Sequence, residues 1–239
     1  MLKVELHTHT SDDPVDRIQH TAVQLVDRAA ALGYDALAIT LHERQLDLHR
    51  IGPYAAERGI ILIPGVERSI QGRHVLLLNF RRGADEVLTF DDLARLKRRE
   101  RGLVVAPHPF FPALSCLRGC MHERPELFDA AEHNAMFTTH VNFNRRAELW
   151  AAHHGKPLVG NCDVHQLRQL GTTYSLVDAA PDAEAICAAI ADGRVEVVSR
   201  PLAMREAARI MGGMFIGDYL RWRNPREQYP RADVDPAVS

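Results

Sequence analysis

The sequence predicts a single α/β domain whose parallel strands close, or nearly close, into a barrel. Three observations support this prediction. Short apolar runs typical of strands alternate with longer helical stretches, about seven such strand–helix units follow one another, and a length of 239 residues suits one domain of this kind. We expect this domain to cover residues 1–222 and a polar, proline-rich tail to cover residues 223–239.

Each element follows from its local pattern. Strands are predicted where short runs are apolar and often β-branched, over residues 2–7, 36–40, 59–63, 74–80, 103–106, 127–132, 157–160 and 195–199. Helices are predicted where apolar or small residues recur at helical spacing, over residues 21–32, 90–101, 144–154, 183–192 and 204–220. Gly33, Gly155 and Gly193 follow three of these helices and are typical helix stops.

Composition narrows the class of protein. Hydrophobic residues make up 46% of the chain, which is enough for a substantial core, and the net charge of −2 disfavours a protein that coats nucleic acid through bulk charge. The sequence shows no run long enough to cross a bilayer and no signal peptide, so we expect a cytoplasmic protein. The four cysteines form no CxxC pair and are interpreted as reduced thiols.

The thirteen histidines are the most informative feature, because several of them and several carboxylates follow predicted strands. The carboxyl ends of parallel strands converge on one face, so we expect these side chains to meet there. They are His7 and His9, His42, Glu67, His108, and Asp163 with His165.

The spacing within these pairs fits a metal site. Residues two apart in an extended chain point to the same side, so His7 with His9, and Asp163 with His165, can each address one ion. Imidazole and carboxylate together suit zinc, manganese or iron, and the two oxygens of Glu67 can bridge two ions. Each motif alone has a simpler interpretation, such as a surface pair or a helix cap, but all of them follow strands.

The ordered set of motifs resembles the PHP (polymerase and histidinol phosphatase) domain family. The resemblance covers residues 2–201, and its most specific parts are residues 6–10 (LHTHT), 38–42 (AITLH), 64–67 (PGVE), 106–109 (APHP) and 161–165 (NCDVH). It implies a distorted barrel of seven βα units with two or three divalent metal ions.

The resemblance also implies a ligand set. A first ion is expected at His7, His9, Glu67 and Asp163, and a second at Glu67, His74 and His108. A third is expected at His42 and His165. Its remaining ligand is left open between Asp12, Asp13 and His20, because residues 11–14 (SDDP) and residues 40–42 (TLH) depart from the family pattern. Glu132 is a further candidate that would orient a ligand from outside the site.

The predicted function is a metal-dependent phosphoesterase that hydrolyses a small-molecule phosphomonoester or a short nucleotide or oligonucleotide. Bound cations lower the pKa of a water from 15.7 to about 7 and so supply a hydroxide nucleophile. His42 or His165 can protonate the leaving group, and Asp163 can take a proton from the water. We expect neither a membrane nor a stable nucleic-acid partner.

Other functions stay open at this stage. An amidohydrolase acting on C–N bonds shares barrel ends and His-x-His motifs, but such enzymes typically carry a bridging lysine where this chain has Glu67. A nuclease or proofreading module is disfavoured by the near-neutral charge. A non-catalytic, metal-binding regulatory module is the third alternative. The sequence leaves the metal identity, the substrate and the oligomeric state undetermined.

Overall fold

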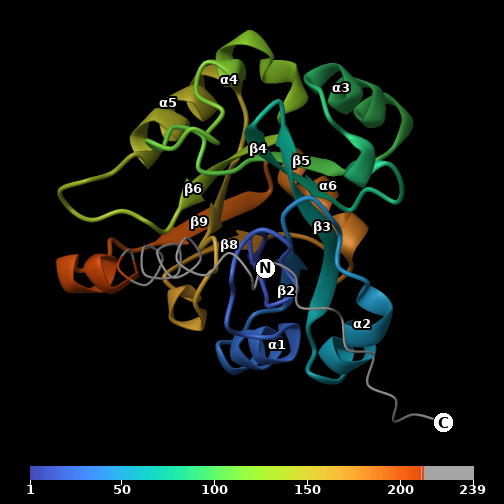
Figure 1. Cartoon of the computed structure of the whole chain (residues 1–239), viewed down its shortest axis with the longest axis vertical. Coiled ribbons are helices and arrows are strands. Elements are labelled where there is room, and N and C mark those ends of the chain that lie inside the picture. Colours follow the sequence, from blue (N-terminus) through green and yellow to red (C-terminus); the bar gives the residue numbers. More distant parts are fainter. Residues whose placement is uncertain (211, 213–239) are drawn as a thin grey trace, which may run out of the picture.

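A mixed nine-stranded sheet that curves into a nearly closed barrel forms the centre of the molecule (Figure 1). The computed structural model describes residues 1–210 and residue 212. The strand order is β7-β6-β5-β4-β3-β2-β1-β8-β9. The barrel predicted from the sequence is confirmed, whereas the predicted tail over residues 223–239 and the end of the helix predicted over residues 204–220 lie outside the described residues.

The strands are β1 (Leu2–Glu5), β2 (Ala36–Ile39), β3 (Ile61–Ile70), β4 (Arg73–Leu78), β5 (Leu103–Ala106), β6 (Ala130–Asn134), β7 (Leu158–Asn161), β8 (Thr173–Val177) and β9 (Val195–Ser199). The helices are α1 (Ala22–Ala31), α2 (Leu48–Glu57), α3 (Phe90–Arg99), α4 (Cys120–Glu123), α5 (Asn144–His154) and α6 (Ala183–Ala191), and short 3₁₀ turns are η1 (Ala84–Glu86), η2 (Pro125–Leu127) and η3 (Leu167–Gln169). Residues 204–210 are also helical.

The sheet is not wholly parallel, which corrects the simple strand–helix alternation expected from the sequence. The β3–β4, β4–β5, β1–β8 and β8–β9 pairs are antiparallel. β3 is ten residues long and continues through Pro64, so Glu67 lies within this strand instead of after it. Gln71 and Gly72 join β3 to β4 with φ values of 51° and 74°, as a two-residue hairpin turn requires.

Besides the short helix α4 and the 3₁₀ turns, two longer elements, α2 and β8, were not predicted. The sequence Gly52-Pro53 disfavours a helix, yet α2 forms around Pro53 because Asp47 caps its first turn and Ile51 and Ala55 are buried. β8 is a half-buried strand, and it lies between β1 and β9. Both elements gain their stability from packing that local sequence patterns do not reveal.

The barrel closes where β7 approaches β8. The Gly160 N–H donates to the Ser175 hydroxyl at 2.9 Å, and that hydroxyl donates to the Gly160 carbonyl at 3.2 Å. A Cβ atom on Gly160 would lie 2.7 Å from the Tyr174 carbonyl oxygen, so only glycine permits this approach. Closing the barrel here also brings the start of the chain next to β7. The Asn161 side chain accepts a hydrogen bond from the backbone N–H of Leu6.

Apolar side chains fill the barrel and support the site from below. Alternate strand residues such as Val4, Ala38, Ile63 and Val105 form one buried cluster with α6. Two further clusters lie under the outer helices, one including residues of α3, α4 and α5 and the other residues of α1 and α2. Since interiors packed in this way resist deformation, the strand ends above them have fixed positions.

Candidate metal centre

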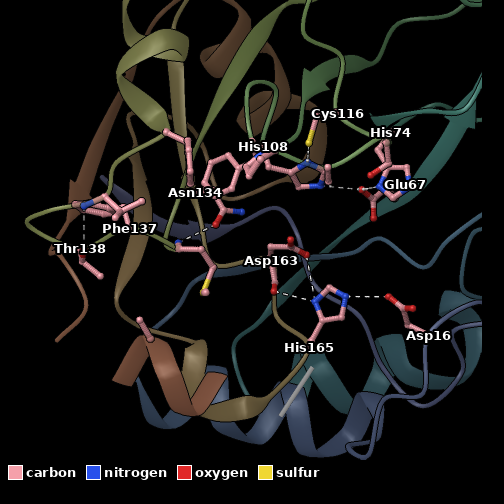
Figure 2. A pocket seen from close by; sticks show the side chains of 18 of the residues that line it. Asp16, Glu67, His74, His108, Cys116, Asn134, Phe137, Thr138, Asp163 and His165 are labelled. Carbon is pink, nitrogen blue, oxygen red and sulfur yellow. Dashed lines mark hydrogen bonds and ion pairs between the residues drawn. The ribbon is translucent and has the colours of Figure 1, made fainter. Parts of the chain in front are cut away.

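The side chains predicted to bind metal gather at one end of the barrel, at the bottom of a cavity (Figure 2). Most follow strands: His7 and His9 come after β1, His42 after β2, His108 after β5, and Asp163 and His165 after β7. Glu67 reaches the same place from within β3. His74 lies at the start of β4, and it points to this end because β4 runs antiparallel to β3.

A first group of ligand atoms surrounds one point. The Nε2 atom of His7 lies 3.3 Å from both Glu67 Oε2 and Asp163 Oδ1. The Nε2 atom of His9 lies 3.4 Å from the same two oxygens. Two imidazole nitrogens and two carboxylate oxygens at this separation match the donor set of a divalent cation such as zinc.

The second oxygen of Glu67 belongs to another group. Its Oε1 atom lies 2.7 Å from His74 Nδ1 and 3.4 Å from His108 Nε2. Because Oε1 and Oε2 face different imidazole sets, Glu67 has the arrangement of a carboxylate that bridges two cations.

A third group adjoins the first. His42 Nε2 lies 3.2 Å from Glu67 Oε2. His165 lies between two carboxylates, with Nδ1 3.3 Å from Asp163 Oδ1 and Nε2 3.0 Å from Asp16 Oδ2, as Figure 2 shows. Asp16 also lies 4.0 Å from His42 Nδ1. Asp16 was not predicted as a site residue, because nothing in the sequence indicates which of the three aspartates within residues 12–16 the loop turns inward.

The three residues left open for this group have different positions. Asp13 lies behind the site, where it contacts the Nδ1 atoms of His9 at 2.9 Å and His42 at 3.0 Å. Asp12 is exposed and accepts a hydrogen bond from the Thr10 hydroxyl. His20 is buried, but it belongs to none of the clustered ligand groups in the described part of the chain.

Outer contacts fix the orientation of the imidazoles. His7 Nδ1 donates to Glu132 at 2.8 Å, and His108 Nδ1 pairs with the Cys116 thiol at 3.4 Å. With the Asp13 contacts of His9 and His42, these bonds leave Nε2 of each ring pointing inward. A ligand whose other nitrogen is held in this way keeps the tautomer and direction that metal binding needs.

Glu132 is the most connected of these outer residues, as its predicted orienting role requires. Besides His7, it accepts hydrogen bonds from the His108 backbone N–H and from the side-chain amides of Asn134 and Asn161. The residue is completely buried. Burial alone would raise the pKa of Glu132, but His7 outweighs it and lowers the pKa.

The ligand atoms themselves lack hydrogen bonds, although they are buried. This holds within the described residues for His7 Nε2, His9 Nε2, both oxygens of Glu67, His74 Nδ1 and Asp163 Oδ1. Burying polar groups without partners is costly, and native proteins rarely do so. Their convergence and chemistry fit divalent metal ions.

The electrostatics of the cluster agree with this interpretation. Burial would raise the pKa of Glu67, but the imidazoles of His7 and His74 dominate and hold that pKa well below its usual value. Burial would lower the pKa of His7, but Asp163 and Glu67 raise it well above the usual value. Both shifts show a site in which positive charge is strongly favoured next to the two carboxylates.

Two ligands have a backbone conformation that is unusual outside glycine. The φ values are 30° at His108 and 52° at Asp163. Left-handed backbone costs energy for such residues and persists where the surroundings hold it, typically at functional sites. Here it turns the chain at the ends of β5 and β7, so that both side chains point into the cavity.

The nearby arginines do not reach the cavity. The Arg68 guanidinium donates to the carbonyls of Val87 and Glu43 and pairs with the Glu43 carboxylate. The Arg73 guanidinium donates to the carbonyls of Leu114 and Cys116. Both groups are therefore occupied by structural contacts.

Comparison with known proteins finds a similar fold in several solved structures. A two-domain protein from Bacteroides vulgatus that contains a predicted PHP-like metal-dependent phosphoesterase is 16% identical, with a TM-score of 0.61 over 89% of this chain and 69% of that one. PsfC from Pseudomonas syringae is also 16% identical, with a TM-score of 0.61 over 92% and 98%. The lesion-specific endonuclease PfuEndoQ from Pyrococcus furiosus is 14% identical, with a TM-score of 0.51 over 88% and 66%.

The fold and the clustered side chains define a barrel protein with His, Glu and Asp groups suited to divalent metal ions. Residues 141–195 match the PHP-associated family model, while a search of curated proteins finds no match. This match and the shared fold support the resemblance to the PHP domain family that the motifs indicate. In the described residues, no helix is long and apolar enough to cross a membrane.

Proposed function

We propose that this chain is a metal-dependent phosphoesterase that hydrolyses a small phosphate ester with two or three divalent cations. The observation that carries the proposal is the set of buried ligand atoms without hydrogen bonds that converge around Glu67 and Asp163. The similarity in fold to proteins described as phosphoesterases and as an endonuclease supports the same reaction class.

The proposed ligand set follows the three groups in the structure. His7, His9, Glu67 and Asp163 hold the first ion, and Glu67, His74 and His108 hold the second. His42 and His165 hold the third, and Asp16, 3.0 Å from His165 Nε2, is the carboxylate proposed beside them, in the place left open between Asp12, Asp13 and His20.

When bound, the cations polarise the phosphate ester and activate water. Asp163, one of the residues that would hold the first ion, would accept the proton of the attacking water. His165 lines the cavity next to Asp163 and Asp16. In the metal-free protein, burial would lower the pKa of His165, but Asp163 and Asp16 raise the pKa well above its usual value, which fits a ring that donates a proton to the leaving oxygen.

His42 is the second candidate acid, since it also lines the cavity. Asp13 raises the pKa of His42 against the lowering effect of burial. The acid role of His42 and His165 belongs to the form with two ions. In the form with three ions, both rings are ligands instead.

Two features favour hydrolysis of a phosphate ester over the alternatives. No lysine lines the cavity in the described part of the chain, whereas an amidohydrolase of the type considered needs one between its metals. The ligand groups are complete and held by outer contacts, which disfavours a decayed regulatory module.

The test is reconstitution of the purified, metal-stripped chain with zinc, manganese or iron, followed by elemental analysis and assays on phosphomonoesters, phosphodiesters and amides. We expect two or three equivalents of metal and turnover of a phosphate ester. Asp163→Asn should abolish turnover, and Asp192→Asn at the exposed end of α6 is the matched control. Stoichiometric metal without turnover of any ester would favour the regulatory module, and cleavage of amides would favour the amidohydrolase.

A further inference from the structure

The cavity above the metal centre extends well beyond the volume that a phosphate group needs. It measures about 840 Å³, within the range of sites that enclose a whole small molecule. The part distant from the ligands therefore contacts the organic portion of the substrate, and its chemistry indicates the class of that portion.

This distant part is apolar and is built from three segments of the chain. Phe111 comes from the loop after β5, Met136, Phe137, Val141 and Phe143 come from the connection between β6 and α5, and Met204 begins the helical residues 204–210. Figure 2 shows Phe137 on the opposite side of the pocket from Glu67 and His74. The phosphate end and the apolar end are thus separate.

Aromatic rings form a continuous wall from the metal centre to the mouth. The ring centroids of His108 and Phe111 are 6.4 Å apart, and those of Phe111 and Phe143 are 5.3 Å apart. Val141, Phe143 and Met204 are 48%, 36% and 61% exposed. Exposed apolar side chains grouped beside a reactive centre are typical of a binding surface.

Cationic groups for a polyanion are absent from this wall. No lysine or arginine lines the cavity in the described part of the chain, and the carboxylates Asp16, Glu67 and Asp163 do. Nucleic acids are held mainly through contacts of basic side chains with phosphates, so a substrate with several phosphates finds no partner beyond the metal centre.

Two polar residues on this side, Asn134 and Thr138, are already engaged in hydrogen bonds. Asn134 donates to Glu132 and accepts from the Met136 N–H. The Thr138 hydroxyl accepts from the backbone N–H groups of His140 and Val141. A sugar or other polyol would lose its hydrogen bonds with water and gain few here.

We propose that the substrate is a phosphomonoester of an apolar alcohol, with an alkyl or arylalkyl group against Phe111 and Phe143 and its phosphate at the metal centre. This inference rests on the proposed function. In the reaction, the oxygen of water bonds to phosphorus, the bond from phosphorus to the alcohol oxygen breaks, and a proton passes to that oxygen. The products are the apolar alcohol and inorganic phosphate.

The test compares 2-phenylethyl phosphate with ethyl phosphate and glycerol 1-phosphate on the manganese- or zinc-loaded full chain. All three leaving groups are primary alcohols, so a difference in kcat/KM reports mainly the pocket. Binding of 2-phenylethylphosphonate and ethylphosphonate, measured by calorimetry, gives a readout that needs no turnover. We expect the phenyl compound to be favoured at least about tenfold in both measurements, since a group that fits an apolar pocket has an effect of this order.

The variant Phe143→Ser should reduce the phenyl preference severalfold in both measurements. Leu149→Ser is the matched control, because Leu149 is on α5 but 72% exposed and outside the cavity lining. Phe111→Ala provides a second variant.

The outcomes separate the two proposals. Hydrolysis of ethyl phosphate with no phenyl preference would overturn the substrate class and leave the phosphoesterase intact. A phenyl preference in phosphonate binding without turnover of any ester would support the pocket and overturn the proposed function. Preference for an oligonucleotide, weakened by added salt, would also overturn the substrate class.

Discussion

The two ends of the cavity are built in opposite ways. At the metal end, side chains on strands or directly after them are mostly buried, and most of the imidazoles have a second contact behind them, such as His7 with Glu132 and His9 with Asp13. At the apolar end, the side chains come from loops and from the start of a helix, and several are more than a third exposed. The barrel therefore holds the metal-binding side chains in place. Loop segments contact the substrate, and they can change without altering the metal site.

The largest effect should come from the residue that joins the metal groups. Glu67→Gln keeps the size of the side chain but removes the charge that faces both ions. We expect loss of at least one metal equivalent and a fall in kcat/KM on the order of 10³-fold, the size of an effect of several kcal/mol. Elemental analysis and kinetics check this, with exposed Glu196→Gln on β9 as the control.

If Glu67→Gln had the metal content and activity of the wild type, the metal end would tolerate substitution at its centre. That result would contradict the proposed difference between the two ends of the cavity.

The next effect tests the contacts behind the ligands. Both oxygens of Glu132 accept hydrogen bonds, so Glu132→Gln places an amide N–H₂ against donors in either orientation. We expect metal affinity to fall by about 10–100-fold, as is usual for such outer residues. Competition with a chelator measures the affinity.

If Glu132→Gln bound metal as tightly as the wild type, the barrel would be positioning His7 without its carboxylate partner.

A third prediction concerns pH. The raised pKa of His7 gives the metal-free protein stability that is complete below about pH 6.5 and is lost as the pH rises through the folded value. The lowered pKa of Glu67 gives stability that is complete above about pH 4.5 and is lost as the pH falls through its folded value. We therefore expect the metal-free chain to be most stable between these two pH values. Outside this range, each kcal/mol lost from the free energy of unfolding should lower Tm by about 2–4 °C.

Thermal unfolding across pH, with and without zinc, measures this. Bound zinc replaces the protons on the imidazoles, so the decline on the alkaline side should disappear. The same alkaline decline in both forms would mean that the imidazoles do not bind the metal.

The smallest effect belongs to the apolar end. Val141→Ser changes a residue that is 48% exposed, so we expect the free energy of unfolding to stay within about 0.5 kcal/mol of the wild type and the metal content to stay the same. Denaturant unfolding and elemental analysis check this. A loss of metal would mean that the apolar end of the cavity and the metal end depend on each other.

Much of the local structure could be predicted from sequence patterns alone. The alternation of strand and helix patterns predicted most elements, including α5 over Asn144–His154 with its glycine stop at Gly155. The two-residue spacing of His7 with His9 predicted that both rings point to the same side, since side chains alternate along an extended chain. The position of these motifs after strands predicted that they meet at one end of a barrel.

The way in which segments distant in sequence lie against one another could not be predicted and depends on the tertiary structure. It selected Asp16 to face His165, put Asp13 behind His9 and His42, and reversed β4 so that His74 reaches Glu67. It also gathered three separate segments into the apolar wall. Periodicity reports the direction of a side chain relative to its own backbone, whereas distances between elements depend on packing across the whole barrel, which no local pattern contains.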